Sequence, residues 1–582
     1  MSQANKPTLK LHLTPNCDNA GSIASLTASL TIGGCLLNPG DPICAFTGAS
    51  GSIDPADVIA ERCIRVEDDN GPMKAFAEKS RDRLDIHVQG HVQGDVTIHL
   101  DTRPGQTASS LRCVNDGLVG TGAFLPRPQA SGEYEITVSA DTTPPMRLVT
   151  SLGEGTLSTT GTETTLQESI FMVGRVQSSS SPAEATSSTT YWLSGLSVPH
   201  AIQDYSNNMC VRLVELFGDD EGMHRAFLAS NEGTRTCSAG LRSTTAVAMV
   251  HDNFNPAGPM AMARAYNKFN VQLPAALSSA VSGVGHNVPL RSVLVEFDAR
   301  AEVDLDWALV RALTGNMMRT RTRLDPEDDG TSNECFSEGL ANMYTICLPF
   351  RFELRTRDYR RATLDAFLTA YFTNPLLGTP VSSVPSDSTT WHAESFLQSH
   401  YCIYMIRMDC LTRRASVARN TGIERPIDEI VADMGVRRRK GQRVQRRDWL
   451  KYMGDWIGYE EARRHLDEVE GGDVLDMDDM KTVFGGIECV DGRVMQMGFD
   501  RVSLTKGVVS GVVQGSNADK AGLRDGDEIA WHSTVSECEG NCEKEFTIRV
   551  RRNGHVREIR FLPRGEKTVK TWLSVKRDIR QS

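Results

Sequence analysis

The chain has no long hydrophobic run and no regular spacing of cysteines. In its 582 residues no apolar stretch approaches the roughly 18 residues that a membrane-spanning helix needs, and the opening sequence MSQANKPTLKLHL lacks the apolar core of a signal peptide. The fourteen cysteines are scattered, which is typical of reduced thiols in a reducing compartment. We therefore expect an intracellular protein, with the cytoplasm as the expected compartment and no membrane partner.

Excess positive charge is also absent. The chain has 63 Lys and Arg against 74 Asp and Glu, so its formal net charge is -11. The molecule as a whole would repel phosphate backbones, and an RNA or another anion would need one local basic patch. Nor does any of the thirteen histidines belong to an H-E-x-x-H sequence. This excludes the zinc helix in which two histidines four residues apart hold the ion.

The length of the whole chain predicts about three or four domains. The first part of the chain has the pattern of β-strands. Segments such as TLKLHLTP (8–15) and GEYEITVSA (132–140) alternate apolar and polar residues, as half-buried strands do. We predict an antiparallel, β-sandwich-like domain over residues 1–190. Its end, QSSSSPAEATSSTT (177–190), is polar and of low complexity, which predicts an exposed loop or linker.

Helical periodicity dominates the middle of the chain. Apolar residues recur every three or four positions in RATLDAFLTAYF (361–372) and in SFLQSHYCIYMIRMDCLTRRA (395–415). VLVEFDA (293–299) has the composition of a strand and precedes a helix expected near residue 304. We predict a mixed, mostly helical domain over residues 191–482, so the chain as a whole is a multidomain α+β protein.

The last hundred residues return to short strands, with GVVSGVV (507–513) expected to be one of them. AGLRDGDEIA (521–530) resembles the helix-to-strand corner of a PDZ domain. In that corner Gly522 would end a short helix and Gly526 would supply the turn before the next strand. We predict a PDZ domain over residues 483–582. Its carboxylate-binding loop would be Met497, Gly498, Phe499 and Asp500. Such a groove binds a peptide as an added strand, and simple packing of the loop is the alternative.

The order of these three domains resembles the glycyl aminopeptidases, a family of zinc metallopeptidases. They are gluzincins in which a thermolysin-like catalytic domain lies between a β domain and a PDZ domain. FSEGLANMY (336–344) resembles the family's helix that supplies the third zinc ligand, and Glu338 takes that place. The segment around Tyr401 resembles the helix whose tyrosine stabilises the oxyanion, with His400 replacing a neighbouring tyrosine.

The resemblance also indicates what this chain has lost. Aligned with the family's zinc helix, LDWALVRALTGNMM (305–318) has Arg311 at the first histidine, Ala312 at the catalytic glutamate and Gly315 at the second histidine. Zinc hydrolysis needs three ligands and a general base, so we expect no metal and no cofactor. A guanidinium stays protonated and cannot bind a metal. We predict instead an ion pair between Arg311 and Glu338.

Two clusters offer other chemistry. His392, Glu394 and His400 could hold a displaced metal, but residues 392 and 400 are about two helical turns apart. The second cluster is a basic segment whose density of charge could bind RNA or another anion. Its residues are Arg437, Arg438, Arg439, Lys440, Arg443, Arg446 and Arg447. The alternative is a solvated segment that pairs with the acidic EGGDVLDMDD (470–479).

Three functions remain compatible with the sequence. The first is a pseudopeptidase that serves as a protein-interaction or scaffold component of a larger complex and binds a protein or peptide through its PDZ domain. The second is an active metallo-aminopeptidase with a displaced metal site, which would release N-terminal Gly or Ala. The third is an RNA- or anion-binding component of an assembly. Because the base and two ligands are missing, we favour the first and expect no enzymatic activity.

Overall fold

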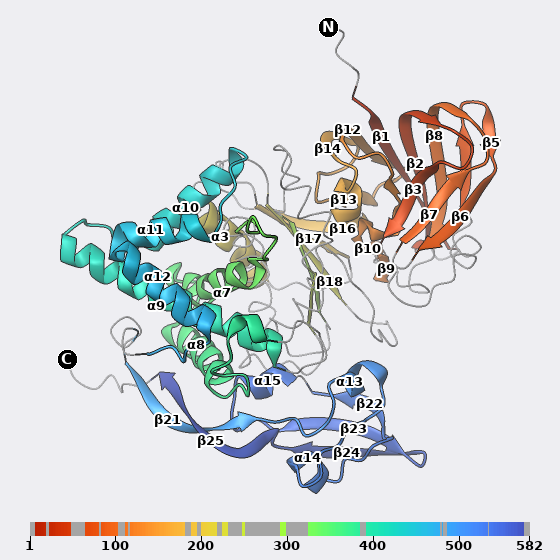
Figure 1. Cartoon of the computed structure of the whole chain (residues 1–582). Helices are drawn as coiled ribbons and strands as arrows, with labels where there is room; N and C mark the ends of the chain where they lie inside the picture. The colour runs from red at the N-terminus through yellow and green to blue at the C-terminus, as the bar shows by residue number, and fades with distance from the viewer. Residues whose placement is uncertain are drawn as a thin grey trace.

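The computed structural model describes the chain in segments, and the described part carries every element below. These segments are residues 6–18, 23–47, 64–80, 83–102, 111–114, 117–180, 188–194, 200–217, 224–230, 247–250, 292–297, 324–384, 392–477, 480, 486–533 and 535–574. Figure 1 shows a β-rich N-terminal unit, a central unit of sheet and helices, and a C-terminal unit of short strands. No helix within these segments is long and apolar enough to cross a membrane.

The N-terminal unit is built from three sheets. A seven-stranded sheet has the order β14-β12-β1-β2-β8-β4-β5, and two four-stranded sheets have the orders β13-β15-β10-β9 and β11-β3-β7-β6. The strands are β1 Thr8–Cys17, β2 Ile23–Leu37, β3 Pro42–Thr47, β4 Arg65–Asp68, β5 Gly71–Met73, β6 Ala75–Ser80, β7 Arg83–Val88, β8 Val92–Thr102, β9 Leu111–Val114, β10 Gly117–Thr121, β11 Arg127–Pro128, β12 Glu133–Ala140, β13 Arg147–Thr150, β14 Leu157–Thr162 and β15 Ile170–Gly174.

The alternating pattern of these strands places one face of the seven-stranded sheet in the core. Leu9, Leu11 and Leu13 of β1 are buried, while the residues between them lie on the outer face. Most pairs of neighbouring strands are antiparallel, as predicted, but β1 and β12 run parallel. The β-rich N-terminal architecture predicted from sequence is therefore present.

A further, five-stranded sheet crosses the expected end of the first domain. It has the order β16-β17-β18-β20-β19, with β16 Val176–Ser180, β17 Ser188–Leu193, β18 His224–Ser230, β19 Val247–Val250 and β20 Ser292–Phe297. The described ends of the predicted loop 177–190 thus form strands, and the boundary at 190 falls inside β17. The polar composition predicted exposure, but Ser188 and Thr190 are buried under the helix α3, His200–Phe217.

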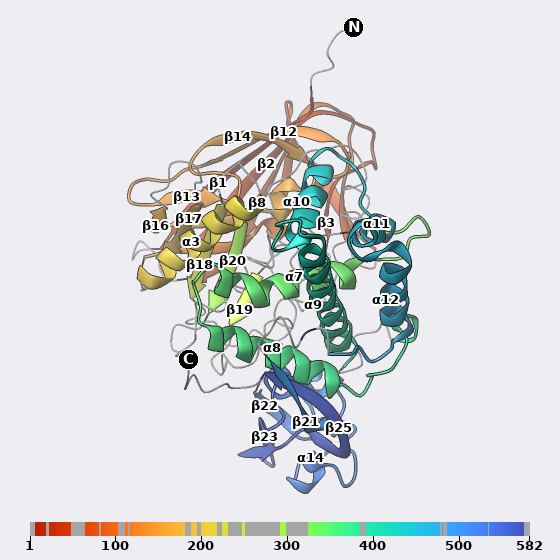
Figure 2. The same ribbon diagram turned by 90° about the vertical axis from the view of Figure 1, so that its left-hand side faces the viewer.

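The helices of the central unit surround one large apolar core. They are α7 Glu334–Arg351, α8 Arg357–Phe372, α9 Ala393–Arg419, α10 Pro426–Arg439, α11 Arg446–Ile457 and α12 Tyr459–Gly471. Both helices predicted from 361–372 and 395–415 are present, and Figure 2 shows α9 running through the middle of the group. The strand predicted over 293–299 is β20. The helix expected near residue 304 lies outside the described residues.

The C-terminal unit contains the predicted glycine corner. Its elements are β21 Ile487–Met495, α13 Val502–Lys506, α14 Asn517–Lys520, β22 Glu528–His532, α15 Val535–Glu539, β23 Phe546–Arg552, β24 His555–Phe561 and β25 Arg564–Ser574. Gly522 and Gly526 follow α14 and have φ of +92° and +86°, as predicted. The strand expected over GVVSGVV (507–513) is absent, because Gly507 and Gly511 adopt φ of +74° and +66° and interrupt extended backbone.

The C-terminal unit is attached to the helical part through α8. In both ribbon views α8 lies against β21 and β25. The Asp365 carboxylate accepts hydrogen bonds from the Ser574 amide at 2.6 Å and from its hydroxyl at 2.8 Å. At the end of α8 the carbonyl of Thr373 accepts from the amide of Met495 at 2.9 Å. These contacts fix the C-terminal unit beside the helices that carry the candidate site.

Candidate functional site: the crossing of α7 and α9

Glu338 lies on α7 directly beside the place where that helix crosses α9. A Cβ atom built on Gly339 would lie 2.4 Å from the Cβ of Tyr401 and 2.6 Å from its carbonyl carbon. These values are far below ordinary contact, so only glycine allows the two helices to approach this closely. Glu338 and Gly339 are adjacent in FSEGLANMY but lie on different sides of α7. Gly339 forms the helix crossing, while the half-buried Glu338 side chain points about 100° around the helix from Gly339.

Tyr401 is buried on α9, and its hydroxyl is already engaged. The hydroxyl donates a hydrogen bond of 2.6 Å to Oε1 of Glu470, which lies on α12. The ring centroid of Tyr401 lies 5.7 Å from that of Phe336, a residue that points about 200° around α7 from Glu338. Burial raises the pKa of Tyr401, and the negative charge of Glu470 raises it further. In this arrangement Tyr401 packs on the Phe336 side of α7.

Arg446 extends this contact to the start of α7. Its Nη1 donates to Oε1 of Glu470 at 2.7 Å, and its Nε donates to Oδ1 of Asn333, the residue preceding α7. Asn333 in turn donates through Nδ2 to Glu327 Oε1 at 2.6 Å. A continuous series of hydrogen bonds therefore links Tyr401 to the turn that leads into α7. No single sequence motif predicts this series.

Carboxylates neutralise most of the positive charge of the basic segment, residues 437–447. Arg438 lies 3.6 Å from Asp325, and Arg443 and Arg447 lie 3.2 and 3.4 Å from Asp328. Arg437 pairs with Asp448 at 2.9 Å, and Arg446 pairs with Glu470. Of these five ion pairs, one involves an acidic residue of 470–479, which is Glu470. The turn at residues 325–328 supplies most of the partners that we had expected from 470–479.

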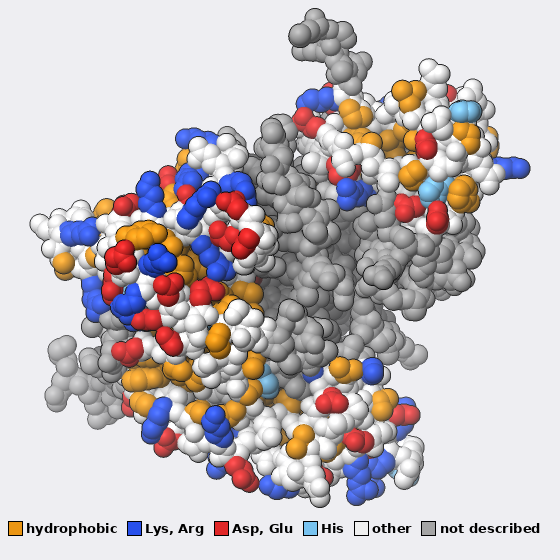
Figure 3. Space-filling view, viewed as in Figure 1, with side chains coloured by type: hydrophobic (Ala, Val, Ile, Leu, Met, Phe, Trp, Pro, Cys, Tyr) orange, Lys and Arg blue, Asp and Glu red, His pale blue; other side chains and the backbone are white. Residues whose placement is uncertain are grey.

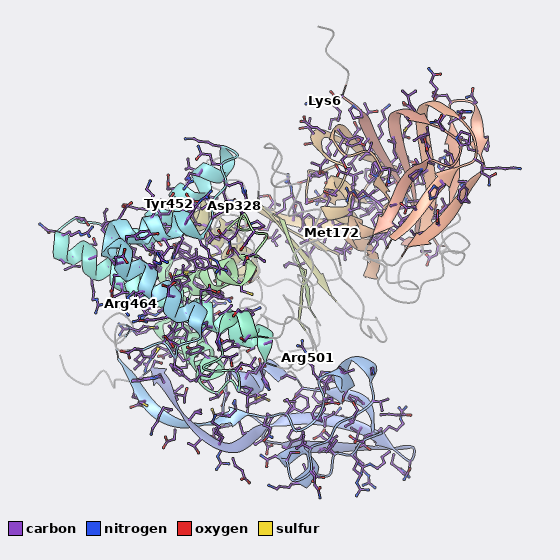
Figure 4. The ribbon with its side chains drawn as sticks, viewed as in Figure 1. Lys6, Met172, Asp328, Tyr452, Arg464 and Arg501 are labelled. Atoms are coloured by element: carbon purple, nitrogen blue, oxygen red, sulfur yellow. The ribbon has the colours of Figure 1, made fainter. Side chains whose placement is uncertain are left out.

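The surface over this segment carries charges of both signs (Figure 3). Basic and acidic side chains are interspersed over the helices α10 to α12 in the space-filling view. Asp328 and Tyr452 are labelled close to these helices in Figure 4. Tyr452 on α11 accepts from Arg437 at 3.4 Å. Lys440 is exposed, and the side chain of Arg439 is outside the described atoms. RNA binding by this segment remains a prediction.

His400 packs in the core behind the crossing. Its ring stacks at 5.0 Å on Phe396 and at 5.5 Å on Tyr371, and its Nε2 lies 2.7 Å from the carbonyl oxygen of Val469. Burial lowers the pKa of His400, because desolvation disfavours the charged ring. His392 precedes α9, about two turns away. Within the described segments no group of three or more His, Cys, Asp or Glu is placed to hold a metal ion.

The residues aligned with the zinc helix lie outside the described residues. Arg311, Ala312 and Gly315 belong to this stretch, so the predicted pair between Arg311 and Glu338 stays a prediction. The donor set can still be tested against zinc. No histidine lies between His286 and His392 in the sequence, and within the described residues Glu338 belongs to no group of three or more possible metal ligands. The described residues therefore do not fit the three-ligand site that zinc hydrolysis requires.

The loop Met497–Asp500 of the C-terminal unit is packed against its own core. Met497 and Phe499 are buried, and Gly498 adopts φ of +79° with its carbonyl accepting from the amide of Val513 at 2.8 Å. The amide of Asp500 donates to the carbonyl of Ser510 at 2.9 Å. The loop is thus paired with the segment 510–513 on one edge. Capture of a peptide carboxylate by its amides stays a prediction.

Cys538 and Cys542 are free thiols, as the sequence indicated. Cys538 is buried at the end of α15, and its carbonyl accepts a hydrogen bond from Nη2 of Arg564. Nη1 of the same guanidinium donates to Oγ1 of Thr373 at 2.9 Å. Arg564 therefore connects α15 to the end of α8, a role that its position at the start of β25 did not reveal.

Comparison with known proteins finds similarity in structure alone. No protein-family model and no curated protein matches the sequence. The aminopeptidase N family protein from Idiomarina loihiensis superposes with a TM-score of 0.62 and 10% identity, over 97% of this chain and 98% of that one. An M1 zinc metallopeptidase from Deinococcus radiodurans has a TM-score of 0.40 and 13% identity, over 81% and 96% of the two chains. The chain thus has the overall fold of an aminopeptidase N family protein.

Proposed function

We propose that this chain is a non-catalytic relative of the zinc aminopeptidases that works as a protein-interaction component. The observation that carries the proposal is the set of possible metal ligands. The sequence has no H-E-x-x-H to supply two histidines and a general base, and within the described residues Glu338 belongs to no group of three or more His, Cys, Asp or Glu. The hydroxyl of Tyr401, which would stabilise an oxyanion in the resembled family, is engaged with Glu470 instead.

The surface proposed for interaction is the C-terminal unit, read as a PDZ domain. Its glycine corner and the loop Met497–Asp500 support this reading, and its firm attachment to α8 would present a bound peptide at a fixed place on the molecule. The peptide would add as a strand beside the loop. An RNA-binding function receives less support, because five arginines of the basic segment form ion pairs within the chain.

The test measures metal and activity on one preparation. Elemental analysis gives zinc per chain, and hydrolysis of glycyl and alanyl p-nitroanilides is followed with and without 1,10-phenanthroline. We expect substoichiometric zinc and no chelator-sensitive hydrolysis. Stoichiometric zinc with hydrolysis that phenanthroline abolishes, and that Glu338→Gln removes, would establish the active aminopeptidase in its place. Peptide binding is checked separately with arrays of free and amidated C-termini, where only free carboxylates should bind.

A further inference from the structure

An open cleft lies at the edge of the N-terminal unit, where the strands β4, β5 and β8 meet. Strand β5 is the last strand of the seven-stranded sheet, and Figure 1 shows it with β6 on the side of this unit that faces away from the helices. The volume of the cleft is about 630 Å³, which lies within the range of sites that bind small molecules. The cleft therefore has room for a ligand, and its side chains indicate which kind.

Three basic residues form one row across this edge of the sheet. Arg65 of β4 lies directly opposite His99 of β8, so both side chains are on the same face of the sheet. On its other side β4 pairs with β5, where Val66 lies opposite Met73. The same antiparallel register brings Lys74, the residue after Met73, beside Arg65. All three basic residues line the cleft.

Two residues of this row have no partner for their charge. Nε2 of His99 lies 2.8 Å from Oε1 of Glu67, which also lines the cleft. Within the described residues the side chains of Arg65 and Lys74 form no ion pair and no hydrogen bond, and both residues are exposed. Like charges side by side on neighbouring strands destabilise a sheet. An anion bound between the two cations would remove that repulsion.

The other residues of the cleft limit the kind of anion. The carboxylate of Glu67 would repel the second charge of a phosphate dianion, so a monoanion fits the cleft better. A guanidinium binds a carboxylate through two parallel hydrogen bonds, and the ammonium group of Lys74 adds a second charged donor. Pro72, Met73 and Ala75 also line the cleft, and they offer apolar surface that an aliphatic chain can cover.

We propose that this cleft binds a small monocarboxylate with an aliphatic chain, such as a medium-chain fatty acid. Arg65 and Lys74 hold the carboxylate group, and the aliphatic chain lies against Met73 and its apolar neighbours. The cleft belongs to a different unit of the chain from Glu338 and from the loop Met497–Asp500. Binding of the carboxylate therefore does not depend on the function proposed above.

The first test titrates sodium octanoate into the full chain and follows carbon-13-labelled methionine methyl groups by NMR. Met73→Leu identifies the resonance of Met73, and Met172→Leu that of Met172, which is buried and does not line the cleft. We expect a saturable shift at Met73 and none at Met172. Octanamide, which has the same chain without the charge, should bind at least about tenfold more weakly. No shift at Met73, equal binding of octanamide, or tighter binding of inorganic phosphate overturns the proposal.

The second test measures the affinity for octanoate in variants of the full chain. Arg65→Gln and Lys74→Gln should each weaken binding at least about tenfold, because each removes a charged contact with the carboxylate. Lys10→Gln is the matched control: Lys10 is an exposed cation of β1 in the same sheet and does not line the cleft, so the affinity should not change. Thermal unfolding checks that each variant is folded. Unchanged affinity in both cleft variants, or an equal loss in Lys10→Gln, would refute the proposed carboxylate site.

Discussion

Gly339 and Tyr401 are in direct contact where α7 crosses α9. The position of a Cβ on Gly339 would fall 2.4 Å from the Cβ of Tyr401 and 2.9 Å from the amide nitrogen of Cys402. Two of the atoms closest to this point belong to the backbone of α9, which cannot move aside without shifting a helix of 27 residues. The geometry of the candidate site therefore depends on one missing methyl group.

Gly339→Ala should destabilise the chain by about 2 kcal/mol or more, because an added methyl group overpacks a helix crossing. The measurement is urea unfolding followed by far-UV circular dichroism. Gly471→Ala is the matched control: it lies at the end of α12, and a Cβ there would meet nothing within 4 Å. Its effect should stay within about 0.5 kcal/mol. Equal effects of the two substitutions would contradict the close crossing.

Arg446→Ala should destabilise the chain by about 2 kcal/mol, because it removes charged hydrogen bonds to Glu470 and Asn333 from a guanidinium that is 19% exposed. Arg447→Ala is its neighbour control. Arg447 is 69% exposed and pairs at 3.4 Å with Asp328, so its loss should cost no more than about 0.5 kcal/mol. Chemical unfolding of both variants measures the difference, and a larger effect of Arg447→Ala would refute the structural role of Arg446.

The stability of the chain should fall as the pH rises above about 10, where tyrosines of the unfolded chain ionise. Burial raises the pKa of Tyr344, Tyr371, Tyr401 and Tyr404 in the folded chain. Above this pH the folded state keeps protons that the unfolded state loses. The free energy of unfolding therefore has its highest value below this pH and decreases above it. Urea unfolding at a series of pH values measures the slope.

Tyr401→Phe should reduce that slope by up to about 1.4 kcal/mol per pH unit, the share of one proton. Tyr459→Phe serves as the control, since Tyr459 is 51% exposed in the folded chain, and its effect on the slope should be smaller than that of Tyr401→Phe. An unaltered slope in Tyr401→Phe would mean that its hydroxyl ionises in the folded chain, against the buried contact with Glu470.

Arg564→Ala should loosen the C-terminal unit from α8. The side chain is 3% exposed and donates to Thr373, to the carbonyl of Cys538 and to that of Asn541 at 3.2 Å. Its removal leaves these acceptors unsatisfied inside the interface. Hydrogen exchange should therefore rise over residues 486–574 more than over α7 and α9. Arg560→Ala, at a 63% exposed guanidinium, should change neither. Uniform exchange across the chain would contradict this role.

Local signals were sufficient for the regular elements. Apolar residues at helical spacing predicted α8 and α9, because a helix with such a face must bury it. Alternation predicted β1 and β12 for the corresponding reason. The same reasoning failed at GVVSGVV (507–513), since β-branched residues favour a strand but the two glycines adopt positive φ. It also failed at 177–190, because polar composition does not show whether a serine lies under a helix.

The partners of the charged residues could not be predicted from their neighbours in the sequence. The sequence shows a basic segment close to acidic residues 470–479, yet Arg443 and Arg447 pair with Asp328, more than a hundred residues earlier. That partner is set by the turn into α7 folding back onto α11. The sequence singled out Glu338 through its motif, whereas the contact of both Tyr401 and Arg446 with Glu470 required three helices to be placed together.

By itself the sequence determined the units rich in strand and helix, the absence of an H-E-x-x-H sequence and the glycine corner near the C-terminus, because these depend on residue types and short spacings. Only the tertiary structure decided that Gly339 meets Tyr401, that Arg564 joins two units, and that Arg65, Lys74 and His99 line one cleft. Strand and helix packing brings together residues that are dozens of positions apart, and the register of that packing is set by the burial of entire faces.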